Sequence, residues 1–366
     1  MTVSSCYRQA LCAFVLSLWA LHACAGTPHD DLRRRLDRLV PGVLAQQRIA
    51  SVSVAHIDHG RLTVAAAWGE AAPGAAATPR TLYNIASMTK PISAETVLRL
   101  VAQGRIALDD RMAPVWTDPD IADDPRRDLL TPRLSLSHRT GFPNWRYETD
   151  GRLRFLRAPG EAFGYSGEGF EYLRRYVEAK TGRTLDALAT AQVLAPAGMR
   201  ETAYTRRPWF DGRMATPHDA DGTPLPPQIA EHALASDEVW STPRDYARFL
   251  IALMRRQGIP ASLAEERMRI QTDRRNELCA SPAVTRCPDA AGIGLGWEVF
   301  RFGARRYLMH TGMDAGTFTL GYFSPDTGRG TVIFTNSSHG PQAVLPILDA
   351  IGEDREFVEF LRALAS

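Results

Sequence analysis

The sequence predicts an α+β fold with one antiparallel sheet that is built from both ends of the chain and flanked by helices. A mostly helical lobe is inserted between the two parts of the chain that form the sheet. Strand-like segments occur near the N-terminus and again after residue 290, whereas helical periodicity and Gly/Pro/Asp-rich connections dominate the middle of the chain. Strands from the two ends find partners most simply in one shared sheet. The predicted sheet lobe spans about 26–103 plus 290–366, and the predicted helical lobe spans about 104–289.

Bulk composition is that of a globular domain. The 366 residues are 45% hydrophobic and 23% charged, which suits one large domain or two lobes that share a core. The formal net charge of +2 gives no electrostatic basis for binding nucleic acid, so no nucleic-acid partner is expected.

The N-terminal part predicts a helix followed by a hairpin. Apolar residues recur with a helical period over 30–47, where Pro41 is expected to bend or divide the helix. Residues 51–56 and 62–68 alternate as strands around a short loop that ends at Gly60.

The remaining elements follow from periodicity and from Gly and Pro positions. A helix is expected to start within 84–90 and to end near Gly104. Irregular connections are expected over 109–132 and 209–229. Further expected elements are helices over 168–182, 185–194 and 242–254, two short strands over 292–307, strands over 317–323 and 330–336, and one or two helices over 345–364.

Residues 1–25 are predicted to be a secretory signal peptide. Arg8 precedes an apolar run over 11–21 that is too short for a membrane span, and Ala23-Cys24-Ala25 suits cleavage after small residues. The expected location is periplasmic or secreted, in a bacterium.

An alternative is a bacterial lipoprotein cleavage box over 21–24, with a lipid anchor at Cys24. His22 fits that box poorly, so plain secretion is favoured over lipidation.

Cysteine positions agree with export. Cys6, Cys12 and Cys24 lie in the signal region, while Cys279 and Cys287 flank a short polar segment and are predicted to form a disulfide. The sequence contains neither a C-x-x-C pair nor an H-E-x-x-H motif, so no metal site is expected.

Ser87 and Lys90 are the candidate catalytic pair. On a helix, residues three apart lie on one face about one turn apart. A neutral amine can accept the proton of a serine hydroxyl, which makes Ser87 a candidate nucleophile and Lys90 its activator. The alternative is a helix N-terminus with Ser87 as its N-cap and Lys90 in solvent.

The scarcity of lysine strengthens this interpretation. The chain has 43 Lys and Arg residues, but only Lys90 and Lys180 are lysines. Arg cannot be deprotonated in a protein, whereas a desolvated Lys can.

Three motifs resemble those of the β-lactamase and penicillin-binding-protein superfamily of serine hydrolases, in its class C and carboxylesterase branch. They are Ser87-Met88-Thr89-Lys90, Tyr165-Ser166-Gly167 before a helix, and His310-Thr311-Gly312, expected before a strand. Segments 136–144 and 239–250 also resemble blocks of that family. The resemblance covers the whole mature chain, 26–366, and implies a β-lactamase/transpeptidase-like fold.

The resemblance also implies roles for these residues. Ser87 would be acylated, and Lys90 and Tyr165 would share the proton transfers, with pKa values brought down from near 10 by their mutual surroundings. Tyr165 would later activate the deacylating water. Backbone N–H groups of Ser87 and Met313 would form the oxyanion hole. The substrate-binding strand would contribute His310, Thr311, Gly312 and Met313, and no cofactor is implied.

Two departures from the family pattern bear on the substrate. Gly167 stands where the family has Asn, and His310 stands where many members have Lys. A neutral imidazole holds a carboxylate poorly. The leading hypothesis is therefore hydrolysis of a small acyl ester or amide. The alternatives are a β-lactamase or D-amino-acid peptidase, and a slow-turnover penicillin-binding or peptidoglycan-sensing protein.

Two neighbouring residues are not assigned to catalysis. Ser166 lies in a near miss of the G-x-S-x-G elbow, without the final Gly and the preceding strand. His138 lies in a family block but is expected to be structural. The sequence leaves open whether Lys90 or Tyr165 is the general base.

Overall fold

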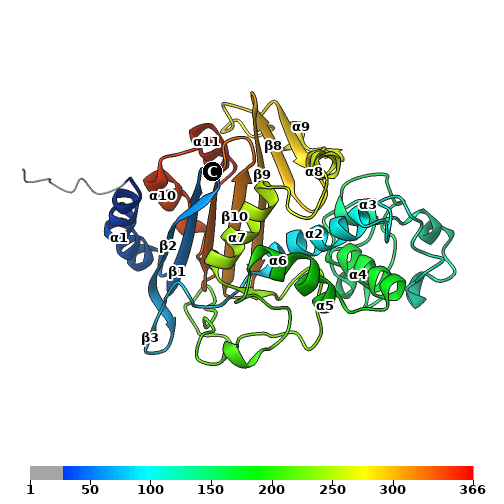
Figure 1. The fold of residues 1–366 in the computed structure, drawn as a ribbon, viewed down its shortest axis with the longest axis horizontal. Helices are drawn as coiled ribbons and strands as arrows, with labels where there is room; N and C mark the ends of the chain where they lie inside the picture. Colours follow the sequence, from blue (N-terminus) through cyan, green and yellow to red (C-terminus); the bar gives the residue numbers. More distant parts are fainter. Residues whose placement is uncertain (1–27, 366) are drawn as a thin grey trace, which may run out of the picture.

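The structure is a computed structural model that describes residues 28–365 (Figure 1). The predicted signal peptide over 1–25 and the alternative lipid anchor at Cys24 lie outside the described residues. Among the residues that the structure describes, no helix is long and apolar enough to cross a membrane.

A nine-stranded antiparallel sheet forms the centre of the fold, in the order β3-β2-β1-β11-β10-β9-β8-β7-β6. Strands β1 and β11 are paired along their length, with Val54 opposite Ile333. The N-terminal and C-terminal strands therefore share one sheet, and the predicted α+β class is confirmed. The strands are β1 (Ser51–Asp58), β2 (Arg61–Ala72), β3 (Ala75–Ala76), β6 (Thr272–Asp273), β7 (Ala290–Ile293), β8 (Glu298–Phe302), β9 (Arg305–Asp314), β10 (Thr317–Ser324) and β11 (Arg329–Thr335).

Both faces of the sheet are covered by helices. Helices α1 (Pro28–Gln47), α10 (Pro341–Ile351) and α11 (Arg355–Leu364) lie on one face, and α7 (Pro243–Met254) crosses the other (Figure 1). Each face of the sheet has its own hydrophobic core. Because side chains alternate along a strand, Val54 packs in the core under α1, α10 and α11, whereas its neighbour Ala55 packs in the core under α7. This explains why every residue of strand β1 before Asp58 is buried, the polar Ser51, Ser53 and His56 included.

Several elements differ from the sequence-based expectation. Pro41 lies inside α1 without dividing it. The helix expected over 185–194 is α5 (Leu185–Ala189) followed by a π-helical turn η5 (Thr190–Leu194) and α6 (Ala195–Ala197). The C-terminal segment agrees with the expectation of one or two helices: it forms two, separated at Gly352, which has a φ of +76°.

The connecting region between the two sheet halves is mostly helical and irregular. It contains α3 (Pro132–Leu136), α4 (Gly167–Thr181), α8 (Ala261–Met268), α9 (Arg275–Leu278), the short β4 (Tyr83–Asn84) and β5 (Trp240–Ser241) pair, and the 3₁₀ turns η2 (Pro119–Ile121), η3 (Pro125–Leu129), η4 (Arg146–Thr149) and η6 (Pro208–Phe210). Helix α7 and strand β6 pack with the sheet although they fall within the range expected for the helical lobe. The division into two lobes stays a prediction.

Cys279, directly after α9, is joined to Cys287 by a disulfide. Their Cα atoms are 5.9 Å apart, a normal span for a disulfide. The bridge closes the short loop that leads into β7.

Helix α2 (Thr89–Ala102) is buried along most of its length and carries a charged group into the core. The Glu95 carboxylate is fully buried between two guanidinium groups, with Arg99 Nη1 at 2.8 Å and Arg267 Nη1 at 2.9 Å. Arg267 belongs to α8, so this buried cluster fixes α2 against the next helical layer.

Removing this carboxylate is expected to destabilise the fold strongly. Glu95→Ala leaves two buried guanidinium groups without their counter-charge, which costs about 3–5 kcal/mol. Urea unfolding measures the loss. Glu265→Ala is the control, because Glu265 is 60% exposed and pairs with Arg306 on the surface, where a pair is worth at most about 1 kcal/mol. Equal losses in the two variants would contradict the role given to the buried cluster.

Candidate active site

The three sequence motifs converge at the N-terminal end of α2. Ser87 lies in the 3₁₀ turn η1 (Ala86–Met88) directly before α2, Tyr165 lies just before α4, and His310 lies on β9. The third motif precedes strand β10, as expected, but residues 310–313 also lie within a strand of their own, β9, which the sequence pattern predicted to end at 307. Strand β9 packs against η1, which brings the motif close to the candidate nucleophile Ser87.

Gly312 permits this close approach. A Cβ at this position would lie 2.2 Å from the Ile85 carbonyl oxygen and 2.4 Å from the Thr319 hydroxyl. The same carbonyl accepts a hydrogen bond from Thr319 Oγ1 at 2.9 Å, so β10 also holds the turn. Met313 comes directly after Gly312 on β9 and is 66% exposed. This placement is compatible with the predicted oxyanion hole, and Thr311 lies on the same strand.

The turn that carries Ser87 is held in an uncommon conformation. Ala86 has a φ of +46°, which costs an L-residue about 1–2 kcal/mol. Asn84 Oδ1 accepts the Ala86 N–H at 2.8 Å, and the Val239 carbonyl accepts the Ile85 N–H at 2.8 Å. These bonds stabilise the turn and leave Ser87 half-buried.

Lys90 is fully buried, and its amine has two hydrogen-bond partners. Nζ donates to Ser87 Oγ at 2.9 Å and to the Ser236 carbonyl at 2.9 Å. It also lies 4.8 Å from the centre of the Tyr165 ring. Burial lowers the pKa of Lys90 to about 8, although the charges of Asp237 and Glu171 act in the opposite direction. The solvent-exposed alternative for Lys90 is therefore wrong.

Tyr165 behaves differently from the expectation. Its ring is stacked on His138 with centroids 4.3 Å apart, and the side chain is 37% exposed. Desolvation raises the pKa of the Tyr165 phenol, and only its hydrogen bond with Ser87 opposes this. The phenol therefore keeps its proton near neutral pH, whereas the sequence had suggested a lowered pKa.

His310 is buried and neutral. Its Nδ1 lies 2.6 Å from the Thr311 carbonyl, an acceptor, so Nδ1 carries the proton. Burial and the nearby Lys90 lower the pKa of His310 to about 3. An uncharged imidazole on β9 supplies no cation for a substrate carboxylate.

His138 and Ser166 have structural contacts. The Ser166 N–H donates to His138 Nδ1 at 3.1 Å, and burial lowers the pKa of His138. Ser166 Oγ donates to the Pro143 carbonyl at 2.6 Å and accepts the Gly169 N–H at 2.9 Å as the N-cap of α4. These contacts agree with leaving both residues out of the catalytic set.

The structure explains why Gly167 stands where the family has Asn. A Cβ at Gly167 would lie 2.8 Å from the Trp145 ring. Asn144, next to Trp145, accepts the Gly167 N–H through its side-chain oxygen at 2.8 Å. Trp145 therefore fills the space that a longer side chain at 167 would need.

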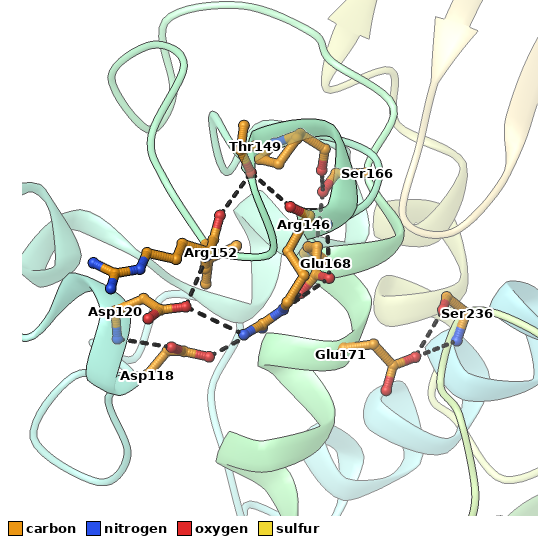
Figure 2. A network of polar contacts seen from close by, with 12 residues as sticks. Asp118, Asp120, Arg146, Thr149, Arg152, Ser166, Glu168, Glu171 and Ser236 are labelled. Atoms are coloured by element: carbon orange, nitrogen blue, oxygen red, sulfur yellow. Dashed lines mark hydrogen bonds and ion pairs between the residues drawn. The ribbon is translucent and has the colours of Figure 1, made fainter.

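An arginine network holds the segment after Tyr165. The Arg146 guanidinium binds Glu168 at 2.8 Å and Asp118 at 3.1 Å, and reaches Asp120 at 3.5 Å (Figure 2). Glu168 lies in the first turn of α4, so this network joins that turn to the connection before α3. Only the mixed charges of that connection hinted at it in the sequence.

Three contributors to the Lys90 environment were missed from the sequence. The Ser236 carbonyl binds Lys90, Glu171 binds Ser236 in turn, and the carboxyl of Asp237 lies near the amine. Burial raises the pKa of Asp237 to about 7 against the opposing effect of Lys90. For Asp237, its position just before segment 239–250 was the only signal, and nothing in the sequence pointed to the Ser236 carbonyl or to Glu171. Among the described residues, no group of three or more His, Cys, Asp or Glu side chains is arranged to hold a metal.

Comparisons with known proteins identify the family of this chain. The sequence profile of the family described as Beta-lactamase matches residues 36–353. Over 237 residues the chain is 32% identical to Esterase EstB from Burkholderia gladioli, covering 54% of this chain and 59% of that enzyme. It is 24% identical over 357 residues to the D-alanyl-D-alanine-carboxypeptidase/endopeptidase AmpH from Escherichia coli (strain K12), covering 91% of each chain.

Solved structures share the fold. The octameric penicillin-binding protein homologue from Pyrococcus abyssi matches with a TM-score of 0.72 at 20% identity, covering 87% of this chain and 76% of that one. D-alanine carboxypeptidase AmpC from Burkholderia cenocepacia matches with a TM-score of 0.71 at 18% identity, covering 88% and 99%. The predicted β-lactamase/transpeptidase-like fold, that of a serine hydrolase superfamily, is confirmed. The chain belongs to the β-lactamase family.

The Trp145 and Gly167 contact gives a testable consequence. Gly167→Asn is expected to lower the melting temperature, because its Cβ meets the Trp145 ring and overpacking of this kind costs about 1–3 kcal/mol. Trp145→Ala removes the ring, so the double variant Trp145→Ala/Gly167→Asn should be no less stable than Trp145→Ala alone. Thermal unfolding of the three variants tests this. An additive loss in the double variant would show that the two positions do not compete for space.

Proposed function

We propose that this chain hydrolyses small neutral esters through an acyl-enzyme formed on Ser87, with Lys90 as the general base. The observation that carries this proposal is the 2.9 Å contact between Ser87 Oγ and a fully buried Lys90 amine whose pKa is lowered to about 8. A base with a pKa near the working pH is the most effective in proton transfer.

The proposed reaction proceeds in two halves. Neutral Lys90 accepts the Ser87 proton as Oγ attacks the ester carbonyl, and the N–H groups of Ser87 and Met313 stabilise the oxyanion. The protonated Tyr165 phenol donates to the departing alkoxide, and the Lys90 ammonium returns a proton to the phenol. A water molecule then attacks the acyl-enzyme with the same groups in reversed roles, which releases the acid and restores Ser87.

The charges around Ser87 support a neutral substrate. Neutral His310 supplies no positive charge, and the Asp237 carboxyl lies near both the Lys90 amine and the Asp314 carboxyl. A substrate carboxylate would gain no positive charge from His310 and would be repelled by these carboxyl groups when they are ionised. The similarity to Esterase EstB points the same way.

The second candidate is hydrolysis of a D-alanyl peptide or a β-lactam. The match to AmpH over 91% of each chain favours it, because that relative is a D-alanyl-D-alanine-carboxypeptidase/endopeptidase. The third candidate is a penicillin-binding protein that forms an acyl-enzyme and releases it slowly, in line with the similarity to Penicillin-binding protein 4 from Amycolatopsis lactamdurans.

The proposed location is outside the cytoplasm, in the periplasm or medium. The Cys279–Cys287 disulfide supports an oxidising compartment, and the signal-like segment over 1–25 supports export. His22 fits the lipoprotein cleavage box poorly, so plain secretion without a lipid at Cys24 is the form proposed.

The first test is hydrolysis of p-nitrophenyl butyrate. Ser87→Ala should abolish release of p-nitrophenol, and Lys90→Arg should lower kcat by about 100-fold or more because a guanidinium cannot act as a base. Lys180→Arg is the matched control: the only other lysine lies exposed in the last turn of α4 and should tolerate the change. Full activity of Ser87→Ala or Lys90→Arg would refute the mechanism.

Substrate comparison and intact mass separate the three candidates. The ester hydrolase predicts a kcat/KM for p-nitrophenyl butyrate at least about 100-fold above that for nitrocefin or a D-Ala-D-Ala peptide, a difference of about 3 kcal/mol. The reverse order would favour the second candidate. A persistent mass adduct on Ser87 without turnover would favour the third.

Activity should depend on pH through Lys90. The lysine is the base only when neutral, so kcat/KM should rise about tenfold per pH unit below 8 and level off above it. The charge of Asp237 favours the ammonium form, so Asp237→Asn should lower the pKa of Lys90. The rising limb of the pH–rate profile should then move to lower pH. A pH–rate profile of both proteins measures the shift. A limb that moves to higher pH in Asp237→Asn would contradict the assignment of Lys90 as the base.

A further inference from the structure

The Lys90 amine depends on a second acceptor as well as on Ser87. A neutral amine has two N–H bonds and one lone pair, and a base must direct that lone pair at the proton it takes. The Ser236 carbonyl accepts one N–H bond at 2.9 Å, which restricts where the lone pair can point. The position of this carbonyl therefore affects how well Lys90 faces Ser87.

Ser236 lies in a segment with little regular structure to hold it. The described residues 211–239 form neither a helix nor an extended strand. The end of the segment is fixed at Val239, whose N–H binds Thr89 Oγ1 at 3.2 Å and whose carbonyl binds the Ile85 N–H. Ser236, three residues earlier, needs its own anchor.

Glu171 provides that anchor. One carboxylate oxygen, Oε1, accepts both the Ser236 N–H at 3.1 Å and the Ser236 hydroxyl at 2.7 Å (Figure 2). The two bonds fix the main chain and the side chain of the same residue. The residue whose carbonyl binds Lys90 is therefore anchored at two of its own atoms.

Glu171 is itself oriented by a buried arginine. Its other oxygen, Oε2, accepts from Arg174 Nε at 2.8 Å, one helical turn further along α4. Arg174 is 6% exposed and also binds Glu178 at 2.9 Å. An ion pair with little exposure keeps the Glu171 carboxylate in one orientation, as a positioning group requires.

We infer that Glu171 is a positioning residue of the active site: its carboxylate fixes the Ser236 backbone, whose carbonyl orients the Lys90 amine toward Ser87. This inference rests on the proposed function, because it takes Lys90 to be the group that activates Ser87. Glu171 acts through Ser236 and is not itself a catalytic residue.

The charge of Glu171 has a second, separable effect. Other groups also face Lys90: Asp237 acts on the amine more strongly than Glu171, while Tyr165 keeps its proton, and His138 and His310 are neutral because burial lowers the pKa of each. The Glu171 carboxylate favours the ammonium form, so its neutralisation should lower the pKa of Lys90. The effect of the Glu171 charge is a shift in pH dependence, whereas the effect of losing the anchor is a lower kcat. The two effects can therefore be distinguished.

The test compares Glu171→Gln with Glu171→Ala. Glutamine keeps one oxygen that can accept both Ser236 bonds but turns its NH2 group toward the Arg174 Nε–H, so kcat should fall by less than in Glu171→Ala, while the acidic limb of the pH–rate profile moves to lower pH. Alanine removes the anchor, so kcat should fall about 10- to 100-fold with KM within about 3-fold, the pattern of a misplaced catalytic group. Initial rates with p-nitrophenyl butyrate from pH 6 to 10 give both readouts.

Glu178→Ala is the matched control. Glu178 lies on the same helix and shares Arg174, but its Oε1 accepts the Leu185 N–H rather than a bond from Ser236. It should keep wild-type kcat and pH dependence even if its melting temperature falls. Ser236→Ala keeps the carbonyl and loses one bond to Glu171, so it should lower kcat less than Glu171→Ala. The double variant Glu171→Ala/Ser236→Ala should be no worse than Glu171→Ala alone.

The outcomes separate this inference from the proposed function. Wild-type kcat in Glu171→Ala, with Ser87→Ala and Lys90→Arg inactive, would overturn the inference and leave the proposed function standing. Equal losses of kcat in Glu171→Ala and Glu178→Ala would show a structural role and also overturn it. Activity retained in Lys90→Arg would overturn the proposed function itself.

Discussion

The buried amine of Lys90 is the constraint on which the rest of the site depends. Transferring an ammonium group from water into a protein interior costs several kcal/mol unless it is paired or loses its proton. Here the amine is provided with a serine hydroxyl, a main-chain carbonyl and an aromatic face, while the nearest carboxyl groups are not in direct contact with it. This environment lowers the pKa of Lys90 without abolishing the charged form, which a base that must gain and lose a proton requires.

The surroundings of this amine come from distant parts of the chain. Helix α2 provides Lys90, the segment before α4 provides Tyr165, the connection before β5 provides the Ser236 carbonyl, and β9 provides His310. Two of these elements are fixed by contacts outside the site: β9, which carries His310, packs on η1 at Gly312, and the Glu95 carboxylate joins α2, which carries Lys90, to α8. A glycine and a buried charge cluster thus determine the geometry of groups that they do not touch.

Much of the fold and part of the site could be predicted from the sequence. Period-two and helical patterns identified the hairpin, α4, α7 and the C-terminal strands, and the scarcity of lysine singled out Lys90. A main-chain carbonyl such as that of Ser236 leaves no trace in a sequence. The direction of the Tyr165 pKa shift depends on burial, and the space at Gly167 depends on Trp145, so neither could be predicted without tertiary structure.

The pairing of β1 with β11 has a consequence for how the protein is made. Val54 and Ile333 are neighbours in the sheet although most of the chain separates them, and β9 to β11 form its middle. During synthesis the turn that carries Ser87 leaves the ribosome long before strands β9 and β10, against which it must pack. Such long-range pairing is slow to form. The nascent chain therefore carries an incomplete catalytic centre until translation is nearly finished, which keeps a hydrolase inactive while it is still being made.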